Sequence, residues 1–399
     1  MTHVVVVGAG QAGSSLVAKL RNSGFTGNIT MIGAEKVPPY QRPPLSKKYL
    51  LGEMDLERLY LRPMNFYSDH NINLRLGEIV TEVDPVAKEI TINEETIIYD
   101  ELVFTTGSNA RHLPDLIGGK LGGVHVVRGL GDVDKMAIEF KKGRHVLIIG
   151  GGYIGLEAAA VAAKLGLRVT LVEMAERILQ RVASSETSDY FRSLHKSHGV
   201  DIREGVGLVK LTGNEKVKSA QLTDGSALDV DFVIVGVGIT PSIELAELAG
   251  CDIENGIKTD ALGRTSVNNI WAAGDCASFP YKGGRIRLES VPNAIDQSEV
   301  IAENIMGGTN EYVAKPWFWS DQFDTKLQIA GLNTGFDNVV SRITETGVSF
   351  WYYVGKTLLA VDAMNEPRAY MIGKRLIESG KSPDKTAIGD CSIDLKSLM

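Results

Sequence analysis

Cysteine is scarce in this chain, which has three among 399 residues: Cys251, Cys276 and Cys391. They form no C-x-x-C pair and match no zinc-binding spacing, so the sequence offers neither a neighbouring dithiol nor a cysteine-based metal site. We therefore expect no metal centre. This sparing use of cysteine is typical of a reducing compartment, and we expect the protein to be cytoplasmic.

Long apolar runs and an excess of basic charge are also missing. No apolar stretch approaches the roughly 18 residues that span a bilayer, and Val4–Val7 is too short for the core of a signal peptide. The 42 Lys and Arg residues are outnumbered by 49 Asp and Glu, which gives a net charge of -7. Nucleic-acid-binding proteins usually show a basic footprint instead. We expect no membrane partner, no export and no nucleic-acid partner.

The chain is long, and it is rich in glycine. At roughly 150 residues per domain, 399 residues predict two or three domains. The composition, 44% hydrophobic and 23% charged, is that of a globular protein with sizeable cores. Its 43 glycines exceed the usual share and indicate many close backbone approaches.

The first group of glycines lies in a strand–turn–helix–strand pattern near the N-terminus. A β-branched strand, Val4–Val7, runs into G-A-G-Q-A-G at residues 8–13, and a helical pattern continues to Asn22. A second buried strand is predicted over Ile29–Ile32. The order is that of a βαβ unit with a dinucleotide-binding glycine motif.

The same pattern recurs 142 residues later, with G-G-G-Y-I-G at residues 150–155. A strand is predicted before it over His145–Ile149, a helix after it over Leu156–Leu165, and a further strand over Arg168–Val172. In such motifs the first glycine permits a tight turn, the second admits the pyrophosphate and the third lets helix and strand pack closely. The helix N-terminus supplies partial positive charge.

An acidic residue follows each motif near the expected spacing of ~20 residues. Glu35 lies 22 residues after Gly13, and Glu173 lies 18 residues after Gly155. Each carboxylate either accepts hydrogen bonds from ribose hydroxyls or is simply a solvated side chain at the end of a strand. Two dinucleotide sites in one chain predict hydride transfer between two cofactors, and NAD(P)H cannot usefully reduce another NAD(P), so one is a flavin. Glu173 would repel a 2′-phosphate, which favours NADH, although Arg177 nearby acts in the opposite direction.

Further strands are predicted around these two units, and the character of the chain changes near Lys315. Apolar strands at 101–105, 232–237 and 269–273 each run into a glycine. After Lys315, short strands at 326–332, 339–343, 348–354 and 358–361 predict an antiparallel sheet, followed by a helix at 369–378. We therefore predict an α/β protein with two Rossmann-like dinucleotide-binding domains and a C-terminal α+β domain with an antiparallel sheet.

Several longer strings make the sequence similar to a known family over essentially its whole length. They include R-P-P-L-S-K at 42–47, T-T-G at 105–107, A-G-D at 273–275, E-S-V-P-N-A at 289–294 and P-W-F-W-S-D-Q at 316–322. With both glycine motifs, these strings resemble the FAD-dependent, NADH-using ferredoxin reductases of bacterial cytochrome P450 and dioxygenase systems, the putidaredoxin reductase type. The resemblance implies a glutathione-reductase-like arrangement of domains. The expected boundaries are 1–108 and 240–314 for the FAD-binding domain, 109–239 for the NADH-binding domain and 315–399 for the C-terminal domain.

The resemblance implies a set of cofactor-binding residues. For FAD they are Gly8, Gly10, Ala12, Gly13, Ala34, Glu35, Arg42, Lys47, Val80, Thr106, Gly107, Arg128, Asp275, Val291 and Trp319. For NADH they are Gly150, Gly152, Tyr153, Ile154, Gly155, Glu173 and Gly238. Asp275 would accept a ribityl hydroxyl or cap a helix, and the cluster Trp317–Trp319 would be either core or a cofactor wall. Tyr153 would shield the flavin face until nicotinamide displaces it.

Lys47 and Glu157 are the candidate catalytic residues. The resemblance puts Lys47 near the flavin N5 edge, where a cation stabilises the charge of the reduced flavin. Nicotinamide has to stack on the flavin, so the start of the second glycine-motif helix faces Lys47. Glu157 is the nearest acidic residue by motif, and a desolvated lysine without a counter-charge is costly. We predict an ion pair within ~4 Å.

The resemblance also implies the reaction and its partner. NADH would reduce FAD, and single electrons would pass to a [2Fe–2S] ferredoxin that serves an oxygenase, with the reductase a monomer or weak dimer. No cysteine precedes Cys251, which disfavours the related disulfide reductases, NADH oxidases and coenzyme A-disulfide reductases. Rubredoxin reductase, monodehydroascorbate reductase and a non-catalytic NADH-sensing flavoprotein stay open as alternatives.

Two smaller expectations concern charged side chains. His195 and His198 have helical i,i+3 spacing but no third ligand, so we expect them to serve a helix C-terminus instead of a metal. Glu299 stands where the family type has a docking arginine. Possible basic contacts for an acidic ferredoxin are Arg62, Lys282, Arg285 and Arg287.

Overall fold

The computed structural model describes residues 1–399, which form two compact units. Unit 1 comprises residues 1–41, 55–109 and 239–316, and unit 2 comprises residues 42–54, 110–238 and 317–399. Residues 42–54, predicted as part of the first FAD-binding segment, group with unit 2. Each unit is described by itself.

Unit 1 is built on a five-stranded parallel sheet. Its strand order is β19 (Ile270–Ala272), β7 (Glu101–Phe104), β1 (His3–Val7), β2 (Asn28–Gly33) and β3 (Ile72–Leu76). Apolar residues on both faces of β1 are buried, as in parallel strands covered on two sides.

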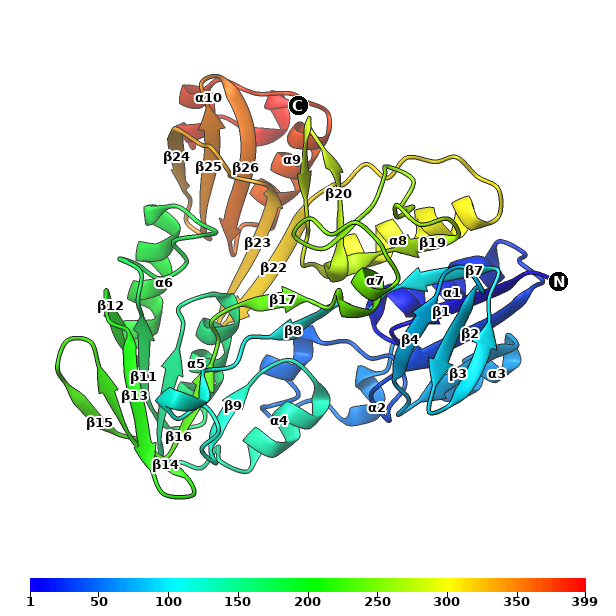
Figure 1. The fold of residues 1–399 in the computed structure, drawn as a ribbon. Helices are drawn as coiled ribbons and strands as arrows, with labels where there is room; N and C mark the ends of the chain where they lie inside the picture. The colour runs from blue at the N-terminus through cyan, green and yellow to red at the C-terminus, as the bar shows by residue number, and fades with distance from the viewer. The chain divides into compact units, whose positions relative to one another are not determined.

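Two layers cover this sheet. On one face, α1 (Gln11–Asn22) and α8 (Val291–Ile305) lie side by side and pack against Val4 and Val6 (Figure 1). On the other face, Val5 and Val7 pack against the antiparallel meander β4 (Val80–Asp84), β5 (Glu89–Ile92) and β6 (Glu95–Ile98). Because successive side chains of Val4–Val7 point to opposite faces of the sheet, they belong to two separate hydrophobic cores.

Short elements complete unit 1. They are α2 (Leu56–Leu59), α3 (Met64–Asp69), β8 (Ser108–Ala110), β17 (Ile239–Pro241), α7 (Glu244–Leu248), β18 (Ile257–Lys258), η3 (Gly274–Cys276), β20 (Ala277–Tyr281) and β21 (Gly284–Ile286).

Unit 2 contains a second five-stranded parallel sheet. Its order is β12 (Asp201–Glu204), β11 (Arg168–Glu173), β10 (His145–Ile149), β16 (Phe232–Val235) and β9 (Val124–Val126). The accompanying helices are η1 (Pro43–Ser46), η2 (Asp115–Ile117), α4 (Leu130–Ala137), α5 (Tyr153–Lys164) and α6 (Ser185–Ser197). An antiparallel meander shares a core with the sheet and consists of β13 (Leu208–Gly213), β14 (Val217–Leu222) and β15 (Ala227–Asp229).

The C-terminal part of unit 2 contains an antiparallel sheet, coloured from yellow-orange to dark orange in Figure 1. Its order is β22 (Trp317–Gln322), β23 (Thr325–Gly331), β26 (Thr357–Met364), β25 (Val348–Val354) and β24 (Asn338–Ile343). The helices α9 (Pro367–Glu378), α10 (Lys385–Gly389) and η4 (Leu395–Leu398) contribute side chains to its core.

The two parallel sheets and the antiparallel C-terminal sheet confirm the predicted fold class. Several predicted boundaries are wrong, and two of these lie at the second glycine motif. The helix expected from Leu156 begins at Tyr153, because Gly152 is its N-cap and the third glycine lies in its first turn. The strand expected over 232–237 ends at Val235, where the chain turns at Gly236 against the first glycine of the motif. Among the elements that the sequence did not predict are α8 and β22.

Candidate functional site

The first glycine motif forms a tight turn between β1 and α1. Gly8 has a φ of +122°, and a Cβ there would lie 2.2 Å from the Thr105 carbonyl oxygen. A Cβ on Gly13 would lie 2.2 Å from the Gly8 carbonyl oxygen, so helix and strand pack too closely for any side chain. A Cβ on Gly10 would meet nothing within 4 Å. The open approach is therefore at the second glycine, where a pyrophosphate comes closest to the backbone.

The second motif repeats this geometry between β10 and α5. Gly150 has a φ of +106°, and a Cβ on it would lie 2.3 Å from the Gly236 carbonyl oxygen. A Cβ on Gly155 would lie 2.1 Å from the Gly150 carbonyl oxygen, whereas one on Gly152 would meet nothing within 4 Å. Neither α5 nor α1 has an acidic residue in its first turn, so both helix N-termini keep their positive potential. Both cradles fit a dinucleotide pyrophosphate.

The acidic residues that follow the motifs are engaged with their surroundings. Glu173 Oε2 accepts from the Gly151 amide at 2.7 Å, and Oε1 accepts from the Ala175 amide at 2.8 Å. Glu35 Oε2 accepts from the Tyr40 hydroxyl at 2.7 Å. Neither residue is merely a solvated strand end. The half-buried Glu173 carboxylate holds the second glycine turn, beside which a ribose would bind.

The Arg177 side chain is engaged with the residues around the start of α6. Its guanidinium donates to the carbonyl oxygens of Ala183 at 2.8 Å and Ser184 at 3.1 Å, and to the Ser188 hydroxyl at 2.5 Å. The side chain therefore holds the N-terminus of α6 in place. Recognition of a 2′-phosphate by Arg177 would require breaking these bonds.

The predicted FAD residues of unit 1 cluster around loops at its sheet. The Thr106 hydroxyl donates to the Ser242 carbonyl at 2.7 Å, and the Gly107 carbonyl accepts from the Ser242 amide at 3.0 Å. Asp275 lies inside η3, whose N-cap is Ala273, and its Oδ2 accepts from the Ser108 hydroxyl at 3.1 Å. Asp275 is therefore not a helix cap. The remaining members lie at the start of α1, after β2, at the start of β4 and at the start of α8, and they are Ala12, Ala34, Val80 and Val291.

The predicted FAD residues of unit 2 come from three segments. Arg42 donates to the Arg128 carbonyl at 2.8 Å, which joins the segment before η1 to the turn before α4. Trp319 is half-buried in β22, with its ring centroid 5.6 Å from that of Trp317. Trp317 also lies 6.4 Å from Tyr370, so this part of the cluster packs on the C-terminal core.

Lys47 and Glu157 form the predicted ion pair, with 2.7 Å between Lys47 Nζ and Glu157 Oε2. Glu157 is 4% exposed and Lys47 15%, so the charges are held largely out of water. The pair forms because η1 and the residue after it pack against α5. It is therefore a preorganised charge pair at the N-terminal part of the helix that opens the second cradle.

Polar neighbours of Glu157 were missed by sequence reasoning. The Ser46 hydroxyl donates to Glu157 Oε2 at 2.7 Å, and the Ser320 hydroxyl donates to Oε1 at 2.7 Å. Both serines are buried. In the sequence, the only indication of their importance is that Ser46 lies in the string R-P-P-L-S-K and Ser320 in the string P-W-F-W-S-D-Q.

Tyr153 occupies the first position of α5 with its ring half-buried. The ring lies 5.1 Å from Phe318 of β22. Its hydroxyl is buried without a hydrogen-bond partner, and burial raises the pKa of Tyr153 well above its usual range, with smaller effects of Asp362 and Tyr352. Of the other predicted NADH residues, Ile154 is 43% exposed and Gly238 has a φ of +100°.

The two histidines of α6 point to different partners. His195 is fully buried and its Nε2 lies 2.8 Å from Gln322 Oε1, while His198 stacks on Phe323 at 3.8 Å. Burial lowers the pKa of His195 to about 4. His198 follows the helix as its C-cap residue, in keeping with the expected position, whereas His195 belongs to the core.

Most of the proposed basic docking residues already have intramolecular partners in unit 1. Arg285 donates to the carbonyls of Thr259 and Ser278, and Arg287 donates to those of Asn255 and Asp275. The Arg62 guanidinium lies 4.6 Å from the Phe66 ring centroid. Lys282 is exposed at the tip of the β20–β21 hairpin.

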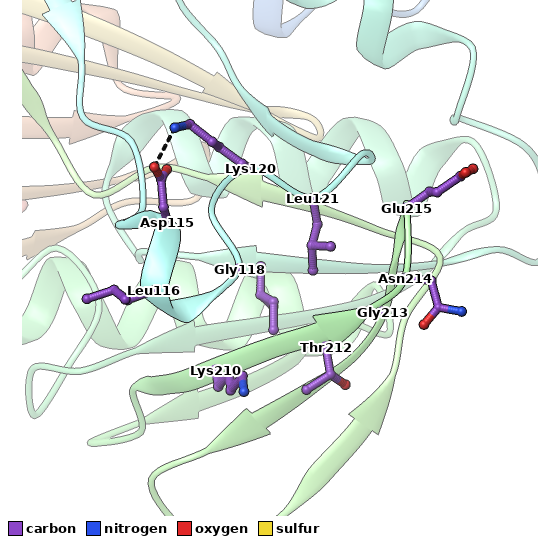
Figure 2. Close-up of a pocket in the computed structure, with 11 residues that line it drawn as sticks. Asp115, Leu116, Gly118, Lys120, Leu121, Lys210, Thr212, Gly213, Asn214 and Glu215 are labelled. Atoms are coloured by element: carbon purple, nitrogen blue, oxygen red, sulfur yellow. Dashed lines mark ion pairs between the residues drawn. The ribbon is translucent and has the colours of Figure 1, made fainter.

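A surface hollow of about 380 Å³ lies in unit 2, between η2 and the β13–β14 hairpin (Figure 2). Lys120 and Asp115 form an ion pair at its rim. None of the glycine-motif residues lines the hollow, and neither does Lys47 or Glu157. It is therefore separate from the dinucleotide cradle of unit 2.

Comparison with known proteins agrees with this geometry. Residues 2–298 match the pyridine nucleotide-disulphide oxidoreductase family, and residues 317–399 match the reductase C-terminal family. The chain is 43% identical to a ferredoxin–NAD(P)+ reductase of Sphingomonas sp., covering 100% of this chain and 98% of the relative. It is 40% identical to rhodocoxin reductase of Rhodococcus erythropolis, covering 98% and 93%. Putidaredoxin reductase in its covalent complex with putidaredoxin has a TM-score of 0.96 at 37% identity, covering 100% and 98%. The chain therefore belongs to the pyridine nucleotide-disulphide oxidoreductase family, in the group of the bacterial ferredoxin reductases.

Proposed function

We propose that this protein is an NADH:ferredoxin reductase that reduces a [2Fe–2S] ferredoxin serving a cytochrome P450 or another oxygenase. The observation that carries the proposal is the pair of matching dinucleotide cradles, one in each unit, in a chain related throughout to ferredoxin reductases. FAD and NAD(P)H are the cofactors of this family. FAD, when bound, accepts a hydride from NADH and releases the two electrons one at a time.

The residues of the first cradle hold FAD. Gly8, Gly10 and Gly13 bring the backbone and the N-terminus of α1 to the pyrophosphate. Glu35 accepts a hydrogen bond from a ribose hydroxyl, and the Asp275 carboxylate accepts one from a ribityl hydroxyl.

The residues of the second cradle hold NADH. Gly150, Gly152 and Gly155 receive the pyrophosphate, while Glu173 accepts the hydroxyls of the adenosine ribose. A 2′-phosphate would place a second negative charge beside this carboxylate, and Arg177 is occupied by Ala183 and Ser184. The site therefore selects NADH over NADPH.

Lys47 and Glu157 serve the hydride-transfer step. Lys47 would supply a fixed positive charge for the negative charge that develops on FAD when it is reduced, because charges oriented before the reaction need no reorganisation during it. Glu157 pairs with this lysine and holds its ammonium group in place. No thiol relay is involved, since all three cysteines are free and both Cys251 and Cys276 are buried.

The remaining expectations are part of the same proposal. No helix in the structure combines the length and apolar character needed to cross a membrane. We place the protein in the cytoplasm as a monomer or weak dimer. The FAD-binding segments are 1–108 and 240–314, the NADH-binding segment is 109–239, and 315–399 is the C-terminal domain.

The test is NADH-dependent reduction of cytochrome c by the FAD-loaded protein, with and without an added [2Fe–2S] ferredoxin. A ferredoxin reductase shows a large rate increase when the ferredoxin is present. Rubredoxin and monodehydroascorbate are assayed in parallel as alternative acceptors, and faster reduction of either would replace the ferredoxin assignment. Flavin reduction by NADH without transfer to any acceptor would favour the NADH-sensing alternative.

A further inference from the structure

A continuous chain of buried hydrogen bonds leads from α6 through β22 to the Lys47–Glu157 pair. His195 Nε2 lies 2.8 Å from Gln322 Oε1, Gln322 Nε2 donates to the Ser320 hydroxyl at 3.1 Å, and the Ser320 hydroxyl donates to Glu157 Oε1 at 2.7 Å. Ser320, Gln322 and His195 are all fully buried. The whole chain lies within unit 2.

The strand β22 meets α5 through one of its two faces. Alternate residues of a strand point to the same side, and Phe318, Ser320 and Gln322 occupy such positions. On α5, Tyr153 and Glu157 are four residues apart and share a helix face. Phe318 packs on Tyr153, and Ser320 hydrogen-bonds Glu157. This face of the strand therefore follows the start of the helix that carries both residues.

The chemistry of the groups sets the direction of the hydrogen bonds. An ionised carboxylate only accepts, so Ser320 donates to Glu157 and has to accept from the Gln322 amide nitrogen. The Gln322 amide oxygen then accepts from His195, whose proton is on Nε2. His195 Nδ1 is then the unprotonated acceptor nitrogen, and it is buried without a hydrogen-bond partner. Every donor in the chain points toward Glu157, and hydrogen bonds aligned in this way polarise one another.

The two oxygens of Glu157 are consequently held from two sides. Oε2 receives Lys47 Nζ and the Ser46 hydroxyl, whereas Oε1 receives only the Ser320 hydroxyl among the protein groups in contact with it. Without Ser320, the carboxylate would be held through Oε2 alone and could rotate, while Lys47 Nζ keeps a longer bond to the Pro43 carbonyl at 3.3 Å. The orientation of the pair thus depends on a residue 163 positions away in the sequence.

We propose that Ser320, supported by Gln322 and His195, is a positioning residue that holds the Lys47–Glu157 pair in the geometry required for hydride transfer. The inference rests on the proposed function. It assigns the C-terminal sheet a part in the chemical step through β22. Ser320 itself does not contact the reacting atoms; it acts through Glu157.

The test uses the FAD-loaded protein in anaerobic stopped-flow reduction by NADH over a range of concentrations. Ser320→Ala is expected to lower the limiting rate of flavin reduction by about 5- to 30-fold, part of the free energy of one hydrogen bond to a charged group, because Lys47 and Ser46 still hold the other carboxylate oxygen. The Kd for NADH is expected to stay within about twofold, because the loss affects the transition state and not ground-state binding. Ser320→Thr keeps the hydroxyl and is expected to restore the rate.

Two further variants keep the test independent of how Ser320 variants fold. Gln322→Met removes the donor to Ser320 at similar volume and is expected to lower the limiting rate by about 2- to 5-fold, since it weakens an aligned bond without removing the one to Glu157. Ser349→Ala is the control. Ser349 is also fully buried in the C-terminal sheet, where it accepts from Trp351 Nε1 at 3.0 Å, outside this chain. Its removal is expected to leave the limiting rate unchanged.

The outcomes separate this proposal from the proposed function. Parent-like limiting rates in both Ser320→Ala and Gln322→Met would overturn the positioning role, as would a raised Kd for NADH with an unchanged rate. An equal loss in Ser349→Ala would also overturn it, because the effect would then be one of general packing. A parent protein whose flavin is not reduced by NADH would instead contradict the proposed function.

Discussion

Thr187 Oγ1 donates a hydrogen bond to Asp362 Oδ2 at 2.8 Å, and both residues are almost completely buried. The bond joins the start of α6 to β26, and the Tyr352 hydroxyl donates to the same carboxylate oxygen. Burial nevertheless raises the pKa of Asp362 to about 6, although these two donors act to lower it. At the other end of α6, burial lowers the pKa of His195 to about 4.

These two groups have opposite effects on the pH dependence of stability. The folded pKa of Asp362 is raised, so its contribution to stability is present below about pH 4 and is lost as the pH rises through 6. The folded pKa of His195 is lowered, so its contribution is present above about pH 6.5 and is lost as the pH falls through 4. Between pH 4 and 6 the two effects oppose each other.

Asp362→Asn is therefore expected to make stability rise more steeply with pH between 4.5 and 6 than in the parent, by up to ~1.4 kcal/mol per pH unit. His195→Gln is expected to change the slope in the opposite direction. The measurement is urea unfolding of the FAD-loaded protein at several pH values, compared between variants. Identical pH slopes in the parent and Asp362→Asn would contradict the prediction.

Glu173 is expected to decide the choice of nicotinamide cofactor. If it accepts the ribose hydroxyls, kcat/KM for NADH exceeds that for NADPH by about 10²- to 10³-fold, from the charge clash and the lost hydrogen bonds together. Glu173→Ala is expected to narrow the gap, and Glu173→Gln, which keeps an acceptor without the charge, to narrow it less. Similar efficiency with both cofactors in the parent would refute the assignment.

Removing either member of the ion pair is expected to slow hydride transfer. Lys47→Ala and Glu157→Ala each lose a preorganised polar contact and are expected to lower the limiting rate of flavin reduction by ~10- to 1000-fold, with FAD still bound. Lys164→Ala on the same helix is the matched control, because its ion pair with Glu53, at 3.0 Å, is exposed. Unchanged rates in the first two variants would end the catalytic role of the pair.

Cysteine is expected to be dispensable for electron transfer. Cys251 and Cys276 are buried, and burial raises the pKa of both thiols, which disfavours the reactive thiolate. The triple variant with alanine at these positions and at Cys391 is expected to retain NADH-dependent turnover within a few-fold of the parent, since no thiol carries electrons. Loss of flavin reduction in a variant that folds and retains FAD would show that a thiol takes part.

Local features determined much of what could be predicted from the sequence. The spacing of the glycines in each motif is enough to predict the tight turn and the helix that follows it. The apolar strands before and after each motif indicate a parallel sheet. The expected ion pair of Lys47 and Glu157 could be inferred because both residues lie within motifs of known geometry. The α5 start was misplaced because Gly152, read as part of the turn, caps the helix.

Only the tertiary structure decided which polar side chains surround that ion pair and where Arg177 points. Ser320 lies 163 residues from Glu157, and Gln322 lies 127 residues from His195, so no spacing rule connects them. In the sequence, strand β22 is recognisable only as a cluster of aromatic residues. Its local pattern does not show which face of the strand packs against α5. Backbone turns depend on residues that are neighbours along the chain, so they can be predicted from the sequence. A buried hydrogen-bond chain depends on packing between distant segments, so only the tertiary structure reveals it.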